Sequence, residues 1–199
     1  MTLKVIVFDF DGTLIDSQQM KLEAFYQVFP PDRFHQKIIA GVLDEIPEES
    51  RYVILASILN SINDEANLEQ QMKRLARDYD HIVVQNAIKC REKPGATGLL
   101  RSACKKYHLY LSSNTPEESL HTIVKCRGWL SFFKAIFGYP RRKEDTLKEI
   151  LRLDQVNPDE IIVVGDGQSD KLSADKTGCN FFMIDDDHAL FQLNKQLNL

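Results

Sequence analysis

The amino-terminal stretch of the chain reads Val5-Ile6-Val7-Phe8-Asp9-Phe10-Asp11-Gly12-Thr13-Leu14. The apolar run at its start is typical of a strand that is buried on both faces, as in a parallel sheet. Two aspartates follow directly. Ligands of open parallel sheets bind beyond the carboxyl ends of the strands, so we expect both carboxylates at a ligand site. Gly12 permits the tight turn that the chain needs next.

Four more apolar runs of the same character lie further along the chain, at residues 109–111, 135–137, 161–164 and 181–184. Helical patterns at residues 117–127, 144–153 and 170–177 separate them. Strands and helices that alternate with short turns favour a parallel sheet, because parallel strands need crossover connections. The sequence therefore predicts an α/β fold with a doubly wound, Rossmann-like parallel sheet.

The long interval between the first two strands has a different character. It shows helical periodicity at residues 20–29, 35–40, 49–59 and 68–88, and it contains no convincing strand. We interpret residues 17–88 as a small all-helical domain inserted into a core of residues 1–16 and 89–199.

The overall composition excludes several classes of function. The chain has 25 Lys and Arg against 29 Asp and Glu, a net charge of −4, so nucleic acid is not an expected partner. The cysteines at positions 90, 104, 126 and 179 have no CxxC spacing, which favours reduced thiols over a zinc site. No apolar run approaches the ~18 residues of a membrane span, and the first run is interrupted by aspartates. We therefore expect a cytoplasmic protein without a membrane partner.

Two neighbouring carboxylates at a ligand site repel each other and need a cation, a shared proton or both. One arrangement meets these needs: Asp9 attacks a phosphorus atom and also binds Mg²⁺, while Asp11 carries the proton of the leaving oxygen. The alternative is a strand that ends in an acidic turn, with Asp11-Gly12 as ordinary turn residues.

The pattern DxDGT after a hydrophobic strand resembles the first motif of the haloacid-dehalogenase-like hydrolase superfamily. The resemblance implies an aspartyl-phosphate at Asp9 and a metal ion held by the Asp9 carboxylate and the Asp11 backbone carbonyl. Dehalogenase members lack an aspartate at the second position, so Asp11 indicates phosphoryl chemistry.

Three later segments resemble the remaining motifs of that superfamily. Ser113 followed by Asn114 matches the second motif, a hydroxyl at a strand end that binds phosphate, and Ser112 is the alternative. Lys143 matches the phosphate-neutralising lysine of the third motif, although the usual Lys-Pro-x-Pro context is absent and Arg142 and Lys148 lie near it.

The fourth motif is matched by residues 161–170, a buried strand followed by an acidic loop. The resemblance implies that Asp166 is a metal ligand and that Asp170 orients Lys143 or a metal-bound water. The similarity extends over residues 4–184, and it implies that the core of residues 1–16 and 89–199 is catalytic and that residues 17–88 form a small all-helical cap domain. Because the core supplies only generic phosphate chemistry, we expect this cap to determine the choice of substrate.

These observations predict a Mg²⁺-dependent phosphatase that hydrolyses a small phosphorylated metabolite through an aspartyl-phosphate. A phosphomutase that passes the phosphoryl group to a sugar phosphate stays open as an alternative. From a different class, a signalling domain phosphorylated on an aspartate, or a catalytically idle binding protein, also stays open. The sequence leaves the oligomeric state undetermined.

Overall fold

A computed structural model describes residues 3–46, 49–62 and 67–199 of the chain. The chain forms two compact units, one of Met1–Ser17 with Ile88–Leu199 and one of Gln18–Ala87. We call the first the α/β unit and the second the helical unit. Each boundary lies one residue from the position that the sequence suggested.

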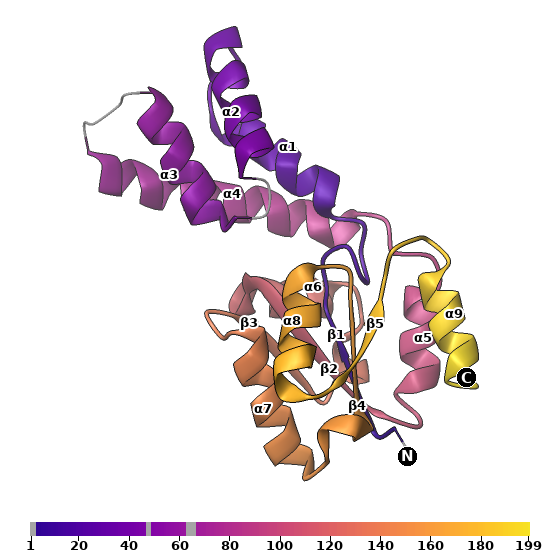
Figure 1. Ribbon diagram of the computed structural model, residues 1–199. Coiled ribbons are helices and arrows are strands. Elements are labelled where there is room, and N and C mark those ends of the chain that lie inside the picture. The colour runs from indigo at the N-terminus through magenta and orange to yellow at the C-terminus, as the bar shows by residue number, and fades with distance from the viewer. Residues whose placement is uncertain (1–2, 47–48, 63–66) are drawn as a thin grey trace. The chain divides into compact units, whose positions relative to one another are not determined.

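The α/β unit is built on a parallel sheet with the strand order β3-β2-β1-β4-β5 (Figure 1). Residues of β1 pair in register with β2 on one side and with β4 on the other, so β1 lies in the middle of the sheet. The predicted doubly wound parallel sheet is thereby confirmed. The strands are β1 (Val5–Phe8), β2 (His108–Pro116), β3 (Ala135–Tyr139), β4 (Ile161–Gly165) and β5 (Asn180–Met183).

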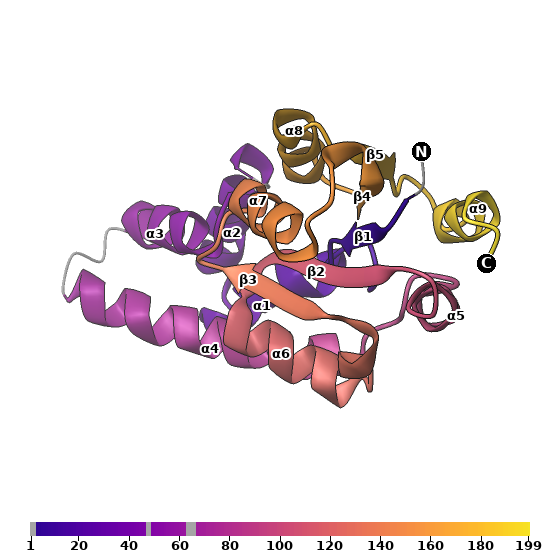
Figure 2. The same ribbon diagram turned by 90° about the horizontal axis from the view of Figure 1, so that it is seen from below.

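Helices cover both faces of the sheet. Helices α7 (Lys143–Asp154) and α8 (Gln168–Thr177) lie on one face, and α5 (Ala96–Ala103), α6 (Glu117–Cys126) and α9 (Ala189–Gln196) lie on the other (Figure 2). Short 3-10 turns, η1 (Leu130–Phe132) and η2 (Pro158–Glu160), precede β3 and β4. Helices α5 and α9 have eight residues each, too few for the helical periodicity that a window of 11–18 residues reveals.

Alternation along the strands builds the core beneath α7 and α8. Val5 and Val7 point to the same face because side chains of a strand alternate, and both are buried against Leu147 and Ile150 of α7. Full burial of such an aliphatic side chain contributes roughly 1.5–3 kcal/mol. This packing fixes the strand that carries Asp9 and Asp11 just beyond its end.

The helical unit has its own hydrophobic core, which includes Phe25, Ile39, Leu55 and Tyr79. Its helices in the described part of the chain are α1 (Gln18–Val28), α2 (Arg33–Glu45), α3 (Arg51–Ile62) and most of α4 (Leu68–Lys89). The described residues of this unit form no strand, in accord with the predicted all-helical insertion. None of the helices described in the chain is long and apolar enough to span a membrane.

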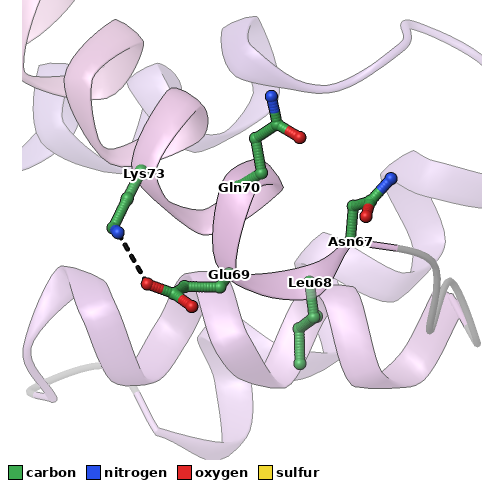
Figure 3. A pocket seen from close by; sticks show the side chains of 5 residues that line it. All are labelled: Asn67, Leu68, Glu69, Gln70 and Lys73. Atoms are coloured by element: carbon green, nitrogen blue, oxygen red, sulfur yellow. Dashed lines mark hydrogen bonds and ion pairs between the residues drawn. The ribbon is translucent and has the colours of Figure 1, made fainter.

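A surface pocket of about 450 Å³ lies at the start of α4 (Figure 3). It is lined by Asn67, Leu68, Glu69, Gln70 and Lys73. Glu69 and Lys73 form an exposed ion pair there with an N–O distance of 2.6 Å. This pocket contains none of the residues that the sequence singles out for chemistry.

The two segments that connect the units are tied to each other within the α/β unit. The Asp16 amide donates to the carbonyl of Arg91 at 2.9 Å, and the Lys93 amide donates to the carbonyl of Leu14 at 3.0 Å. Ile15 and Glu92 form an antiparallel bridge between these bonds. The chain therefore leaves and re-enters the α/β unit through one short antiparallel ladder.

Candidate active site

The candidate residues gather at the carboxyl edge of the sheet. Asp9 follows β1 directly, and its backbone amide still donates to the carbonyl of Val164 on β4 at 2.8 Å. Asp166 follows β4, and Asp170 lies in the first turn of α8. Lys143 is the first residue of α7, in the connection that leaves β3. Because all the strands are parallel, their ends bring these side chains to one site.

Lys143 joins two carboxylates at this edge. Its Nζ donates to Asp9 Oδ1 at 2.9 Å and to Asp170 Oδ1 at 2.7 Å. The three side chains are only 9%, 7% and 3% exposed for Lys143, Asp9 and Asp170, so each charge has lost most of its hydration. Buried charges of this kind require partners. Lys148, the neighbouring alternative, instead pairs with Glu144 on the surface of α7.

Burial also sets the protonation equilibria of this group. Desolvation raises the pKa of Asp9 to about 7, against the opposing attraction of Lys143. Desolvation likewise raises the pKa of Asp170. For Lys143 burial acts to lower the pKa, but Asp9 and Asp170 together raise it above its ordinary value. Lys143 therefore carries a positive charge. Its attraction does not fully offset the cost of burying the two negative charges of Asp9 and Asp170.

Three carboxylates form a donor set for a cation. Oxygens of Asp9, Asp166 and Asp170 all lie within 4.8 Å of one another. The Oδ2 atom of Asp170 is buried and accepts no hydrogen bond from any residue that the structure describes. Close carboxylate oxygens with an unsatisfied acceptor suit a hard divalent ion such as Mg²⁺. The donor set therefore fits a metal ion in both charge and chemistry.

Gly165 allows Asp170 to reach this position. A Cβ atom on Gly165 would lie 2.4 Å from Asp170 Cγ and 2.6 Å from its Oδ2, far closer than non-bonded carbon atoms approach. The carboxylate of Asp170 therefore rests against the backbone at the end of β4. This contact explains the glycine at the junction of the strand and the acidic loop.

Asp11 is surrounded by hydroxyl groups. Its Oδ1 accepts from Ser17 Oγ at 2.6 Å. Its Oδ2 accepts from Thr115 Oγ1 at 2.7 Å and from Ser113 Oγ at 3.4 Å. Gly12 has a φ of 76°, a left-handed conformation that turns the chain immediately after Asp11. The side chain of Asp11 thus has different neighbours from that of Asp9, which faces Lys143.

The residues proposed for the second motif lie at the end of β2. Ser113 is buried with its hydroxyl next to Asp11, whereas Asn114 is exposed. Ser112 is buried and pairs with Phe137 of β3, and strand alternation places its side chain on the face opposite to Ser113. The geometry therefore favours Ser113 over Ser112 as the hydroxyl at the site.

Three hydroxyl residues contact the site without having been predicted. Thr13 Oγ1 donates to Asp166 Oδ1 at 3.1 Å, and Ser17 and Thr115 donate to Asp11 as described above. Thr13 belongs to the first motif, but its spacing indicated no partner 153 positions away. Ser113 and Thr115 share a period of two, which would have indicated a common face if β2 had been predicted to extend that far.

Comparison with known proteins gives the site a context. A profile of the haloacid dehalogenase-like hydrolase family matches residues 6–184. A phosphoglycolate phosphatase of Vibrio cholerae is 26% identical over 189 residues, which cover 91% of this chain and 84% of the relative. The range matched by the profile includes Asp9, Asp11, Asp166 and Asp170.

Solved structures show the same fold. A HAD-hydrolase of Bacillus subtilis, crystallised with bound magnesium, has a TM-score of 0.74 at 16% identity, with both chains covered completely. A structure described as a β-phosphoglucomutase of Thermotoga maritima has a TM-score of 0.69 at 18% identity, and the match covers 96% of this chain and 91% of that one. Because the family profile matches most of its length, including the two aspartates that follow β1, this chain belongs to the haloacid dehalogenase-like hydrolase family.

Proposed function

We propose that the protein is a Mg²⁺-dependent phosphatase that hydrolyses a small phosphate monoester through an aspartyl-phosphate on Asp9. The observation that carries this proposal is the contact of Lys143 with both Asp9 and Asp170, in a carboxylate cluster that Asp166 completes. A buried nucleophile beside a buried cation, next to a metal donor set, suits the transfer of a group with concentrated negative charge.

The carboxylates of Asp9 and Asp166, together with the backbone carbonyl of Asp11, would hold the Mg²⁺ ion. Asp170 would act from beside them, because one of its oxygens contacts Lys143 and the other is unsatisfied. Bound Mg²⁺ supplies neutralisation of the phosphoryl charge.

The side chains of the protein account for the bond changes. A carboxylate oxygen of Asp9 attacks the phosphorus atom, the ester P–O bond breaks, and Asp11 donates a proton to the leaving alkoxide oxygen. Water then attacks the phosphorus of the aspartyl-phosphate while Asp11 accepts its proton. The bond between phosphorus and Asp9 breaks, and inorganic phosphate leaves. Lys143, Ser113 and Asn114 would bind the phosphate oxygens during both steps.

For the substrate, the names of the relatives suggest 2-phosphoglycolate or a similar small phosphomonoester. A group of relatives called phosphoglycolate phosphatase matches about 90% of this chain at 22–26% identity. The first choice for an assay is therefore 2-phosphoglycolate. We assign the choice among substrates to the helical unit. This unit has its own hydrophobic core, so its surface residues can differ between related proteins without disturbing the catalytic residues of the α/β unit.

The test is phosphate release by the purified protein with Mg²⁺ across 2-phosphoglycolate, sugar phosphates and nucleotides. We expect hydrolysis of at least one small ester, complete loss of turnover with a chelator, and recovery when Mg²⁺ is restored. Conversion of a sugar phosphate to its isomer without net phosphate release would indicate a phosphomutase instead. Stable phosphorylation without turnover, or no reaction with any ester, would contradict the phosphatase proposal.

A further inference from the structure

Thr115 makes the shorter of the two hydrogen bonds from β2 to Asp11. Its Oγ1 lies 2.7 Å from Asp11 Oδ2, whereas Ser113 Oγ lies 3.4 Å from the same atom. Thr115 is itself buried, with 7% of its surface exposed. A buried hydroxyl at hydrogen-bonding distance from a carboxylate restricts the rotation of that carboxylate.

The end of β2 is irregular at this point. Ser112 pairs with Phe137 and Pro116 pairs with Tyr139, so β2 uses four steps where β3 uses two. Irregularities of this type redirect side chains near active sites. Within this irregular segment the backbone amide of Thr115 donates to Ser113 Oγ at 3.1 Å. This hydrogen bond holds the two hydroxyl residues in a fixed relative position.

Gly138 on β3 makes room for the segment. A Cβ atom at Gly138 would lie 2.7 Å from the carbonyl oxygen of Thr115 and 2.5 Å from Glu117 Cα. The Gly138 amide donates to Glu117 Oε2 at 3.2 Å. The backbone of Thr115 is therefore held against β3 at a distance that only glycine permits.

From this geometry we infer that Thr115 is a positioning residue, which aims the carboxyl group of Asp11 at the leaving oxygen of the substrate. The inference rests on the proposed function. In that function Ser113 binds phosphate, so its hydroxyl turns from Asp11 to the substrate. Thr115 then stays as the hydroxyl of β2 that holds Oδ2, while Ser17 holds Oδ1.

The side chain of threonine suits this task. Its β-branched carbon restricts rotation about χ1, so the hydroxyl stays fixed with respect to the strand. A hydroxyl group can donate or accept a hydrogen bond, so the contact can persist when Asp11 carries a proton and when it has lost it. Thr115 itself forms and breaks no covalent bond.

The test compares substrates whose leaving groups differ in their need for a proton. It compares kcat/KM for two esters, the alkyl phosphate that the wild-type protein hydrolyses fastest and 2,4-dinitrophenyl phosphate. This parameter reports the steps up to formation of the aspartyl-phosphate. The alkoxide leaving group needs a proton from Asp11, whereas dinitrophenolate needs none. If the carboxyl group of Asp11 is wrongly oriented, kcat/KM should therefore fall only for the alkyl ester.

We expect Thr115→Val, which keeps the shape and removes the hydroxyl, to lower kcat/KM for the alkyl ester by about 10–100-fold. The same variant should change kcat/KM for the dinitrophenyl ester by less than about threefold. Thr115→Ser restores the hydroxyl on a side chain that rotates more freely, so its kcat/KM for the alkyl ester should lie between those of Thr115→Val and the wild type. For the dinitrophenyl ester it should stay within about threefold of the wild type. Thr122→Val is the matched control, because Thr122 is exposed on α6 and donates to the Glu118 carbonyl.

An equal loss for both esters in Thr115→Val, with the thermal unfolding temperature unchanged, would overturn the inference. Wild-type kinetics in Thr115→Val would overturn it as well. If the wild-type protein hydrolyses both esters in these cases, the proposed phosphatase function still stands. If the wild-type protein hydrolyses neither ester, the proposed function fails, and the role of Thr115 fails with it.

Discussion

At the scale of single residues, Lys143 is the buried cation on which the candidate site depends. It contacts Asp9 from the start of the chain and Asp170 from near its end. Removing one partner of a buried ion pair leaves an uncompensated charge and costs about 3–5 kcal/mol. An exposed pair on a helix contributes only about 0.3–0.5 kcal/mol. Helix α7 contains a lysine in each kind of ion pair, Lys143 in a buried one and Lys148 in an exposed one.

Lys143→Met should therefore lower the free energy of unfolding by about 3 kcal/mol without Mg²⁺, and it should abolish measurable phosphate release. Urea unfolding and a phosphate assay check these two expectations. Lys148→Met is the control, because Lys148 pairs with Glu144 and is 58% exposed. Equal effects of the two substitutions would contradict the central role of Lys143.

Another buried carboxylate, outside the candidate site, lies at the amino edge of the sheet. Asp154 is 1% exposed and accepts from His108 Nδ1 at 2.9 Å and from Tyr110 OH at 3.0 Å. Lys134 also contacts it. Burial alone would raise the pKa of Asp154, but the hydrogen bonds from Lys134, His108 and Tyr110 lower it below its ordinary value. This group joins α7 to β2 and to the residue before β3.

The lowered pKa of Asp154 predicts a pH dependence of stability. The folded chain binds the proton more weakly than the unfolded chain, whose pKa is about 3.9, so ionised Asp154 stabilises the fold above that pH. Asp154→Asn should lower the free energy of unfolding by about 1–3 kcal/mol at pH 6. The difference should shrink as the pH falls below about 4. A difference that grows on acidification would contradict this account, and turnover should be unchanged at neutral pH.

At the scale of elements, β4 and α8 pack closely where they meet at the site. The Asp170 side chain occupies the space that a side chain at Gly165 would need. Gly98 in α5 provides a contrast, because a Cβ atom there would meet nothing within 4 Å. Neither glycine has the positive φ that would itself demand glycine.

Alanine at these two positions should change stability in opposite directions. Gly165→Ala displaces Asp170 and should cost about 1–3 kcal/mol by overpacking, with a loss of turnover because Lys143 loses one of its two carboxylate partners. Gly98→Ala should add roughly 0.5–1 kcal/mol, because alanine favours a helix interior. Thermal unfolding measures both. A stable and fully active Gly165→Ala protein would show that Asp170 needs no close contact with β4.

The elements also show what the sequence can predict. Both ends of β1 were predicted correctly, and β4 was predicted to within one residue, because each is a continuous apolar run of four residues that ends abruptly at aspartate or glycine. The end of β2 was missed, since Ser113 and Thr115 have the composition of a helix cap and not of a buried strand. Packing against β3 and contact with Asp11 override that local preference.

At the scale of the whole molecule, the chain separates into an α/β unit and a helical unit with distinct cores. The antiparallel ladder between residues 14–16 and 91–93 joins the two connections. The sequence indicated this division from periodicity alone, because strands and helices differ in period. Contacts such as that of Thr13 with Asp166 join residues far apart in the chain, so no local pattern could predict them.

For the candidate site, too, local patterns could be predicted from the sequence and long-range contacts could not. The positions of Asp9, Lys143, Asp166 and Asp170 were predicted from strand ends and motifs, and the structure brings them together. Their catalytic roles stay predictions. The contacts of Ser17 and Thr115 with Asp11 were found only from the folded chain, because they depend on a turn at Gly12 and on an irregularity in β2.

The central claim is that Asp9 forms the covalent bond to phosphorus. The most direct measurement is phosphate release by Asp9→Asn, compared with the wild-type protein at saturating Mg²⁺ and substrate. The amide keeps the size of the side chain and removes the nucleophilic oxygen, so we expect turnover to fall at least about 1,000-fold, while urea unfolding shows a folded protein. Hydrolysis by Asp9→Asn at the wild-type rate would contradict the account.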